Sequence, residues 1–214
     1  MIEFLSQYSL GPRFMEETPD EQTIKNEPMF FQMPLADAYD AGGPITRCFL
    51  HRLGMPRAGR HDNAWLDSRV HMLMPGWWPC IPGWHHDDVE RSREDGQPNY
   101  RNASYRPHFA LGLVGTAYCP TEFATGLFQL PDVENGIIYK DWHPRIDADV
   151  DKLVSAAPYN QIVYFDDRTL HQGTQCTQGG WRWFGRVTFG NPNKPAAEMR
   201  RQVNVYMEHP MEGW

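Results

Sequence analysis

The sequence predicts a mainly β protein, a β-sandwich or jelly roll of about eight core strands with helices packed outside it. Two observations support this fold class. The 18 glycines and 18 prolines are spread through the 214 residues, and such punctuation favours many short strands over long helices. Between them lie short segments rich in apolar, β-branched and aromatic residues, a composition typical of strands in a packed sheet.

Six segments are the predicted strands, at residues 69–74, 109–114, 125–130, 136–139, 161–165 and 181–189. Two helices are expected. One is capped by Asp147 and carries Val150, Leu153 and Val154 on one face, and the other begins near Pro195. The first 60 residues mix helix and coil signals and predict no order of elements.

Composition limits the classes of protein. A length of 214 residues fits one domain, residues 1–214, with a substantial core. The net charge of −7 argues against a nucleic-acid partner and favours a small-molecule substrate. No apolar run approaches the ~18 residues of a membrane helix, and the first residues lack the basic region and long apolar stretch of a secretory signal, so we expect a cytoplasmic protein. The four cysteines, which form no CxxC pair, are expected to be reduced and mostly buried. The sequence predicts no oligomeric state.

A histidine and aspartate pair lies at the end of an apolar, aromatic stretch. The residues His85-His86-Asp87-Asp88 contain HxD twice, in overlapping registers. Alternate residues of a strand point to the same face, so His85 with Asp87, or His86 with Asp88, can hold one ion, but only one pair can face a cavity. Both registers remain open at this point.

A second group follows the predicted strand 161–165. His171 lies in a segment expected to form a hairpin with the strand 181–189. In that last strand Arg182, Arg186 and Thr188 share one face, while large apolar residues occupy the other. Two arginines on one inner face can bind a carboxylate through paired hydrogen bonds.

Together, the HxD motif, the distal histidine in "TLHQGT" and the arginines in "WRWFGRVTF" resemble the iron(II)/2-oxoglutarate-dependent dioxygenase superfamily. Trp84-His85-His86-Asp87 resembles the W-H-x-D of phytanoyl-CoA-hydroxylase-like members, and Arg186-Val187-Thr188 resembles the R-x-S/T that contacts the co-substrate in other members of the superfamily. The resemblance covers about residues 69–190, a jelly-roll catalytic core flanked by residues 1–60 and 191–214.

The resemblance implies a double-stranded β-helix that binds Fe(II) through His85, Asp87 and His171. It also implies that the far carboxylate of 2-oxoglutarate binds Arg182 or Arg186, the latter with Thr188, and that no further catalytic side chain is needed. The activity implied is hydroxylation of a C–H bond with decarboxylation of 2-oxoglutarate to succinate. Two alternatives remain: a cupin-type metalloenzyme that works without 2-oxoglutarate, and a non-catalytic β-sandwich binding or assembly module.

Overall fold

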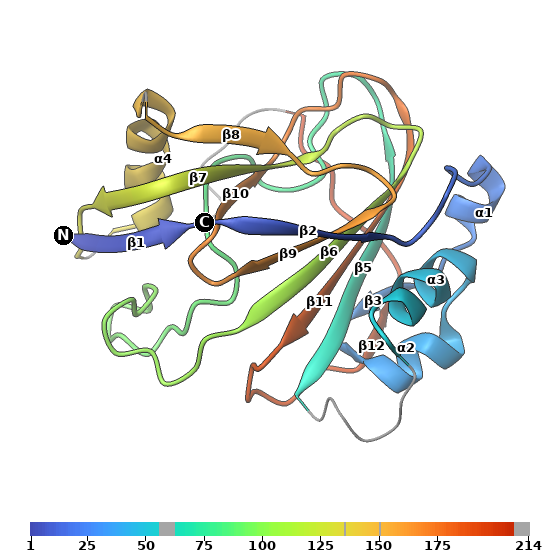
Figure 1. The fold of residues 1–214 in the computed structure, drawn as a ribbon, viewed down its shortest axis with the longest axis horizontal. Coiled ribbons are helices and arrows are strands. Elements are labelled where there is room, and N and C mark those ends of the chain that lie inside the picture. Colours follow the sequence, from blue (N-terminus) through green and yellow to red (C-terminus); the bar gives the residue numbers. More distant parts are fainter. Residues whose placement is uncertain (56–62, 135, 150, 208–214) are drawn as a thin grey trace.

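The computed structural model describes residues 1–55, 63–134, 136–149 and 151–207. Its strands form antiparallel sheets, two of which lie face to face (Figure 1). The larger sheet has the order β2-β9-β6-β11-β5-β4. Its strands are β2 (Tyr8–Arg13), β9 (Gln161–Asp166), β6 (His108–Gly115), β11 (Gly180–Phe189), β5 (Ala64–Leu73) and β4 (Met33–Pro34).

The second sheet is built around β7, which pairs with each of its other three strands. Its members are β1 (Ile2–Ser6), β7 (Thr121–Leu130), β8 (Leu153–Ala156) and β10 (Leu170–Gly173). A third, two-stranded sheet joins β3 (Met29–Phe31) to β12 (Glu198–Arg200). The described part of the chain is therefore mainly β, with antiparallel sheets, in agreement with the predicted fold class.

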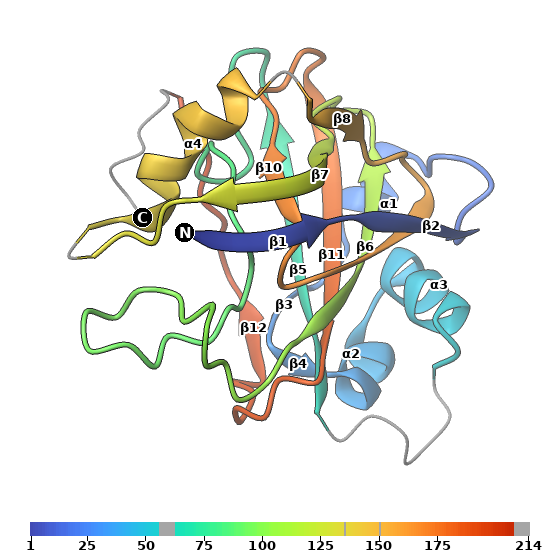
Figure 2. The ribbon, with the colours of Figure 1, turned by 60° about the vertical axis from the view of Figure 1, so that its left-hand side comes forward.

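The helices of the described residues lie on the outer faces of the sheets (Figure 2). They are α1 (Glu21–Lys25), α2 (Leu35–Ala41), α3 (Pro44–Arg52) and α4 (Ile138–Ala148). The first three pack on the six-stranded sheet, where Phe49 of α3 contacts Trp183 of β11 with ring centroids 5.5 Å apart. Helix α4 packs with β1 and β7 through a separate cluster that contains Trp142. None of the described helices combines the length and apolar character needed to cross a bilayer.

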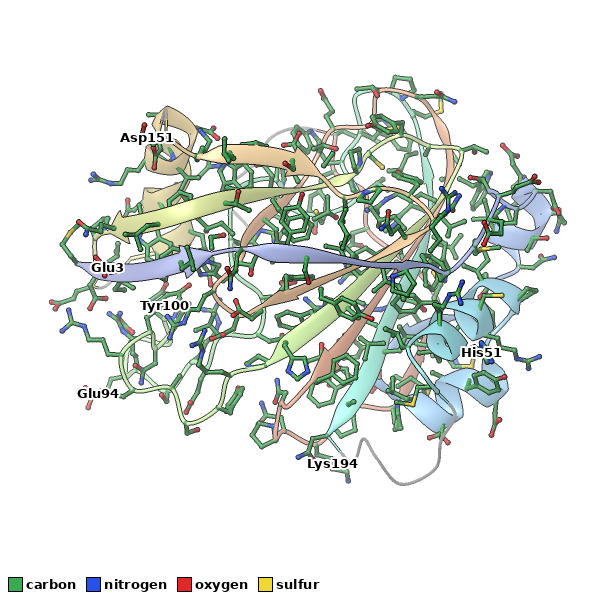
Figure 3. The ribbon with its side chains drawn as sticks, in the orientation of Figure 1. Glu3, His51, Glu94, Tyr100, Asp151 and Lys194 are labelled. Carbon is green, nitrogen blue, oxygen red and sulfur yellow. The ribbon has the colours of Figure 1, made fainter. Side chains whose placement is uncertain are left out.

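Alternation along β11 decides which side chains reach the space between the sheets. Trp183 and Val187 belong to the cluster beneath the helices, as the sequence predicts. Phe184, on the opposite face, packs against the cluster between the two sheets, whose members include Phe109 of β6 and Phe123 of β7. Side chains fill this interior (Figure 3). The inner face of β11 therefore lies against the four-stranded sheet, which carries His171.

The structure corrects three local predictions. Residues 136–139, predicted as a strand, include the start of α4, whose buried residues Ile138, Trp142 and Ile146 repeat at helical spacing. The helix predicted from Asp147 does not form: α4 ends at Ala148 and β8 begins at Leu153, while Val150 lies outside the described residues. The helix predicted near Pro195 is replaced by β12.

The predicted hairpin between the His171 segment and β11 is also wrong. Strand β10 pairs with β7, and β11 lies between β6 and β5 in the other sheet. The turn-rich residues 175–179 therefore carry the chain from one sheet to the other. His171 and the arginines of β11 face each other across the interior instead of lying side by side in one sheet.

Candidate metal centre

The segment before the HxD motif is anchored by Trp84, whose side chain is buried. Its indole Nε1 donates to Oδ1 of Asp147 at 2.7 Å, and its backbone N–H donates to Nδ1 of His143 at 3.2 Å, both on α4. Asp147, predicted to begin a helix, thus lies in the last turn of α4 and accepts a hydrogen bond from this tryptophan. Trp84 therefore ties the backbone just before His85 to helix α4.

His85 and His171 are directly paired across an isolated antiparallel bridge. The backbone N–H of each donates to the carbonyl of the other, at 3.0 and 3.1 Å. This pairing places the two imidazole rings 4.5 Å apart between centroids. Two histidines far apart in the chain are thus held side by side by backbone hydrogen bonds.

Asp87 completes a group of three. Its Oδ2 lies 3.0 Å from Nε2 of His171, and its Oδ1 lies 3.8 Å from Nε2 of His85. One potential ligand atom from each residue falls within 4.8 Å of the others. The side chains of His85, Asp87 and His171 are 12 %, 25 % and 6 % exposed, so the group is shielded but reachable.

Backbone carbonyls orient both imidazoles. Nδ1 of His85 lies 2.8 Å from the Gly83 carbonyl, and Nδ1 of His171 lies 2.9 Å from the Thr169 carbonyl. A carbonyl can only accept, so Nδ1 carries a proton in both rings, and in the neutral ring of His85 Nε2 presents a lone pair. Burial, followed by the nearby His171, lowers the pKa of His85 to about 4, so this ring is neutral near pH 7.

The charge of Asp87 suits a cation as well. Burial opposes its ionisation, but Arg186 and His171 outweigh burial and hold the pKa of Asp87 well below its usual range. A carboxylate beside the lone pair of His85 places two acceptors together, an arrangement that a divalent cation stabilises. Two imidazoles and one carboxylate form the facial set typical of non-haem iron sites. The donor set therefore fits Fe(II).

The two overlapping registers are separated by the structure. His86 points the other way, and its ring lies edge-on to Phe4 with centroids 4.8 Å apart while its Nδ1 lies 2.7 Å from the Tyr100 hydroxyl. Asp88 adopts a left-handed backbone, with φ of 49°, which breaks the strand alternation. Of the two registers, His85/Asp87 is the one that meets His171; its role in binding metal stays a prediction.

Arg186 and Thr188 reach the acidic residues of the motif. Arg186 Nη1 forms an ion pair with Asp87, and its Nη2 lies 3.3 Å from Oδ2 of Asp88 and 3.7 Å from Oδ2 of Asp67. Thr188 Oγ1 donates to Asp88 at 3.4 Å. Burial alone would lower the pKa of Arg186, but these three carboxylates raise it. Both residues therefore hold the carboxylates of the motif in place, and a co-substrate role for them is untested.

Arg182, the other arginine predicted to bind co-substrate, is 2 % exposed and lies opposite His71 of β5. Within the described residues no carboxylate is recorded in an ion pair with it. It also does not appear among the described residues that line the cavity next to the three-residue group. The structure thus places Arg182 deeper in the interior than Arg186, and its role also stays a prediction.

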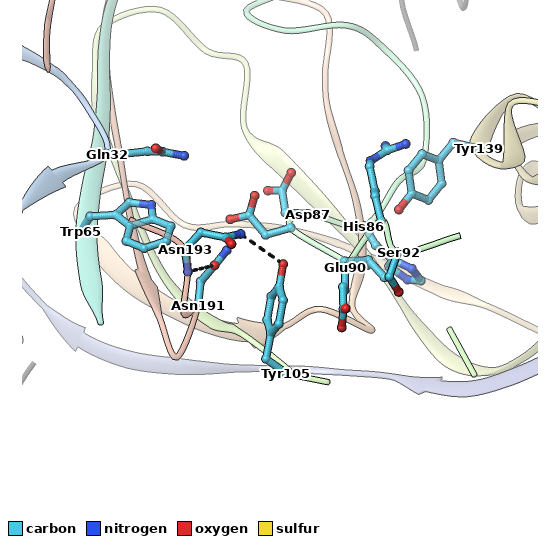
Figure 4. A pocket seen from close by; sticks show the side chains of 13 residues that line it. Gln32, Trp65, His86, Asp87, Glu90, Ser92, Tyr105, Tyr139, Asn191 and Asn193 are labelled. Carbon is cyan, nitrogen blue, oxygen red and sulfur yellow. Dashed lines mark hydrogen bonds between the residues drawn. The ribbon is translucent and has the colours of Figure 1, made fainter. Parts of the chain in front are cut away.

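Three cavities meet at Asp87. An inner cavity of about 170 Å³ lies between the sheets. The three-residue group lines it together with Asp67, Arg69, Arg186, Cys80, Thr121 and apolar residues. An outer cavity of about 480 Å³ shares Arg69, Cys80, His85 and Asp87 with it. A third, of about 590 Å³, lies on the side of Asp88; in Figure 4, Asp87 lies between Trp65 and Tyr139. Asp87 can therefore be approached from inside the sandwich and from two outer sides.

The sequence analysis missed Arg69, which lines both the inner and the outer cavity. A signal was present, because the charged Asp67 and Arg69 alternate with Leu66 and Val70, which pack beneath the helices. Such alternation predicts charged side chains on an inner face. It also missed the segment 200–206, whose side chains wall the outer cavity.

No family model matches this sequence, and no curated protein matches it. Among solved structures, HygX from Streptomyces hygroscopicus with iron bound is similar at 10 % identity and a TM-score of 0.39, over 88 % of this chain and 83 % of that one. HygX with nickel and 2-oxoglutarate bound is similar at 11 % identity and a TM-score of 0.39, over 88 % and 84 %. Likeness at this level does not by itself assign a fold family or a function to this chain.

Proposed function

We propose that this chain is an iron(II)- and 2-oxoglutarate-dependent dioxygenase that hydroxylates a C–H bond of a small molecule. The observation that carries the proposal is the convergence of His85, Asp87 and His171, with both imidazoles oriented by backbone carbonyls. Three protein ligands leave other positions on the ion free for a bidentate co-substrate and dioxygen.

We propose a double-stranded β-helix, or jelly roll, as the fold of this core. From β5 to β11, the chain passes back and forth between the sheets. Strands β5, β6, β9 and β11 belong to the six-stranded sheet, whereas β7, β8 and β10 belong to the other, to which His85 is bridged through His171. Repeated crossing between two facing antiparallel sheets is expected of a jelly roll.

The residues around the site would have separate roles in binding the metal and in excluding water. His85, Asp87 and His171 would hold the iron, and Arg186 would keep Asp87 ionised and oriented. Leu111, Phe165 and Phe184 line the inner cavity and would exclude water from a co-substrate bound there. Bound iron with 2-oxoglutarate and dioxygen would supply the oxidising chemistry, with 2-oxoglutarate converted to succinate and carbon dioxide.

The remaining expectations are part of the same proposal. The outer cavities, at about 480 and 590 Å³, are of the size that small ligands occupy, so a small-molecule substrate is favoured. The cytoplasmic location stays a prediction. A cupin-type enzyme, the nearest alternative, would turn over its substrate without 2-oxoglutarate.

The test is an anaerobic titration of the protein with iron(II) and then 2-oxoglutarate, followed by visible spectroscopy. The wild type is expected to develop the weak charge-transfer band of chelated 2-oxoglutarate. His171→Ala should lack it, whereas His51→Ala, which changes an exposed histidine of α3, should retain it. A wild type that binds iron but develops no band would reject the co-substrate. A band that survives in His171→Ala would reject that ligand.

A further inference from the structure

Arg69 occupies the boundary between two cavities. It lies on β5 opposite Phe184 of β11, and it lines the inner cavity between the sheets and the outer cavity. His85 and Asp87 line the same two cavities. A ligand entering from either side would meet the guanidinium and the candidate metal centre together.

The guanidinium of Arg69 is not neutralised by an acidic side chain. Within residues 1–55, 63–134, 136–149 and 151–207, no carboxylate forms an ion pair with it, and its Cζ lies over the Phe184 ring, 5.7 Å from the ring centroid. The nearby carboxylate of Asp67 is engaged elsewhere, by Arg200 at 3.1 Å and Arg186 at 3.7 Å. Arg69 is thus a cation that its neighbours leave without a counter-ion.

The surroundings of Arg69 work against its charge. Burial lowers its pKa, and the positive charges of Arg200 and Arg186 lower it further, while the smaller opposing effect of Asp67 does not restore it. A shielded charge without a partner costs free energy that an anion would offset. This unfavourable free energy indicates that an anionic ligand would bind next to Arg69.

The lining of the outer cavity points the same way. Alternate residues Arg200, Gln202, Asn204 and Tyr206 of the C-terminal segment line it, and each can donate a hydrogen bond. Apart from Asp87, the charged side chains of this lining are arginines. The third cavity differs, because its lining adds the carboxylates of Asp88 and Glu90 to that of Asp87. An anion is therefore favoured on the Arg69 side of Asp87.

We propose that Arg69 is the carboxylate-binding residue of this site, a role that the sequence analysis gave to the arginines of β11. The planar guanidinium would bind a carboxylate through two parallel hydrogen bonds. The inference rests on the proposed function. The carboxylate comes either from the far end of 2-oxoglutarate in the inner cavity or from the substrate in the outer cavity.

The test compares wild type with Arg69→Gln and Arg69→Lys, with Arg47→Gln as a control on the exposed side of α3. In the first arm, Mn(II)-loaded protein is titrated with 2-oxoglutarate without oxygen. In the second arm, the same protein, saturated with 2-oxoglutarate, is titrated with acetate, and binding is followed through the relaxation of the acetate methyl protons by Mn(II).

Arg69→Gln is expected to weaken binding on the order of 10- to 100-fold in one arm, since a charge-assisted pair is lost. Arg69→Lys should weaken binding less, because it keeps the charge and loses the fork. The melting temperature of the metal-free variant should not fall, since an unpaired cation is removed; a merely structural arginine would lower it. If Arg69→Gln does not fold, weakening in Arg69→Lys carries the test.

Loss in the first arm would assign the carboxylate to the co-substrate, and loss in the second arm alone would assign it to the substrate. Unchanged binding in both arms, in variants of a wild type that binds Mn(II) and 2-oxoglutarate, would overturn the role of Arg69 and leave the proposed function standing. A wild type that binds neither would overturn both.

Discussion

His85 and His86 are neighbours in the chain and largely shielded from solvent, yet they serve opposite faces of one segment. His85 faces Asp87 and His171, with its Nε2 3.8 Å from a carboxylate oxygen. His86 lies among Phe4, Tyr100 and other aromatic rings, and it is 4 % exposed. Burial lowers the pKa of both imidazoles, so both are neutral near pH 7.

What separates the two histidines is the group that meets Nε2. Across the described residues, Nε2 of His86 has no hydrogen-bond partner, and its ring is held by packing and by the Tyr100 hydroxyl. Nε2 of His85 is aimed at a site with a carboxylate and a second imidazole. His85 and His86 have the same residue type and similar burial. Only the neighbours from distant parts of the chain make His85 a candidate ligand and His86 a core residue.

The largest effect is expected on the aromatic side. Trp142 is fully buried, lies 5.7 Å from Phe4 between ring centroids, and donates from Nε1 to the Pro131 carbonyl at 2.8 Å. Trp142→Ala should lower the free energy of unfolding by about 3–5 kcal/mol, measured by urea denaturation. Leu127→Ala, at a position 63 % exposed, should change it by less than about 0.5 kcal/mol. Equal losses in the two variants would contradict this view of the aromatic cluster.

His85→Ala should show the opposite pattern. Iron(II) affinity should fall about 100-fold or more, because changing even an outer-shell partner costs ~10- to 100-fold. The metal-free protein should lose about 1 kcal/mol or less, since the ring is partly exposed and lies at the edge of the aromatic cluster, where its neighbours include Tyr139 and His171. Equilibrium dialysis and urea denaturation measure the two quantities. His86→Ala should lose stability and keep its iron affinity; the reverse result would exchange the roles of the two registers.

A third buried histidine, His71, tests whether an imidazole shielded from solvent and surrounded by arginines stays neutral as the pH falls. Burial, then the charges of Arg182 and Arg69, lowers the pKa of His71 to about 3. An unfolded histidine titrates near ~6.5, so below that pH the unfolded chain binds a proton that the native protein excludes. The stability contribution is therefore present above about pH 6.5 and lost as the pH falls towards 3, at up to ~1.4 kcal/mol per pH unit.

Urea denaturation of the metal-free protein between pH 7 and 4 measures this slope. His71→Gln should flatten it, whereas His51→Ala, at an exposed position, should leave it unchanged. An identical slope in wild type and His71→Gln would show that His71 does not contribute.

The smallest effect is expected from Tyr100→Phe. The Tyr100 hydroxyl lies 2.7 Å from Nδ1 of His86 and 3.0 Å from the Tyr139 hydroxyl. Its removal should lower the free energy of unfolding by about 1–2 kcal/mol, because a buried imidazole nitrogen loses its partner. Iron(II) affinity should stay within about 2-fold of wild type, because the lost contact lies on the far side of the segment from the candidate ligands. A large loss of affinity would mean that the aromatic cluster sets the position of His85.

Much of the sheet structure could be predicted. Five of the six predicted segments overlap the strands β5, β6, β7, β9 and β11. Helix α4 could not be predicted, because Pro144 lies within it. The apolar residues Leu153 and Val154 suggested a later helix, but they lie in β8 and are 70 % and 44 % exposed. Apolar spacing predicts a helix only where that face is buried by another part of the chain.

The candidate site was predicted in part. The residues His85, Asp87 and His171 follow from motif spacing and family resemblance, and the structure brings them together. The hairpin expected to join His171 to β11 was wrong, because turn residues indicate that a chain reverses and do not indicate which sheet it joins. Arg69 was missed because the sequence does not show which residues surround it, and so does not show that no carboxylate pairs with it.

By itself, the sequence determined the residue types of the site and the faces of its strands, since alternation along a strand follows from local backbone geometry. It thereby placed Trp183 and Val187 opposite Arg182 and Arg186. Only the tertiary structure decided between His85 and His86, because that choice depends on the backbone pairing of His85 with His171. The carboxylate that meets the two imidazoles and the missing counter-ion of Arg69 depend likewise on groups that folding brings from distant parts of the chain.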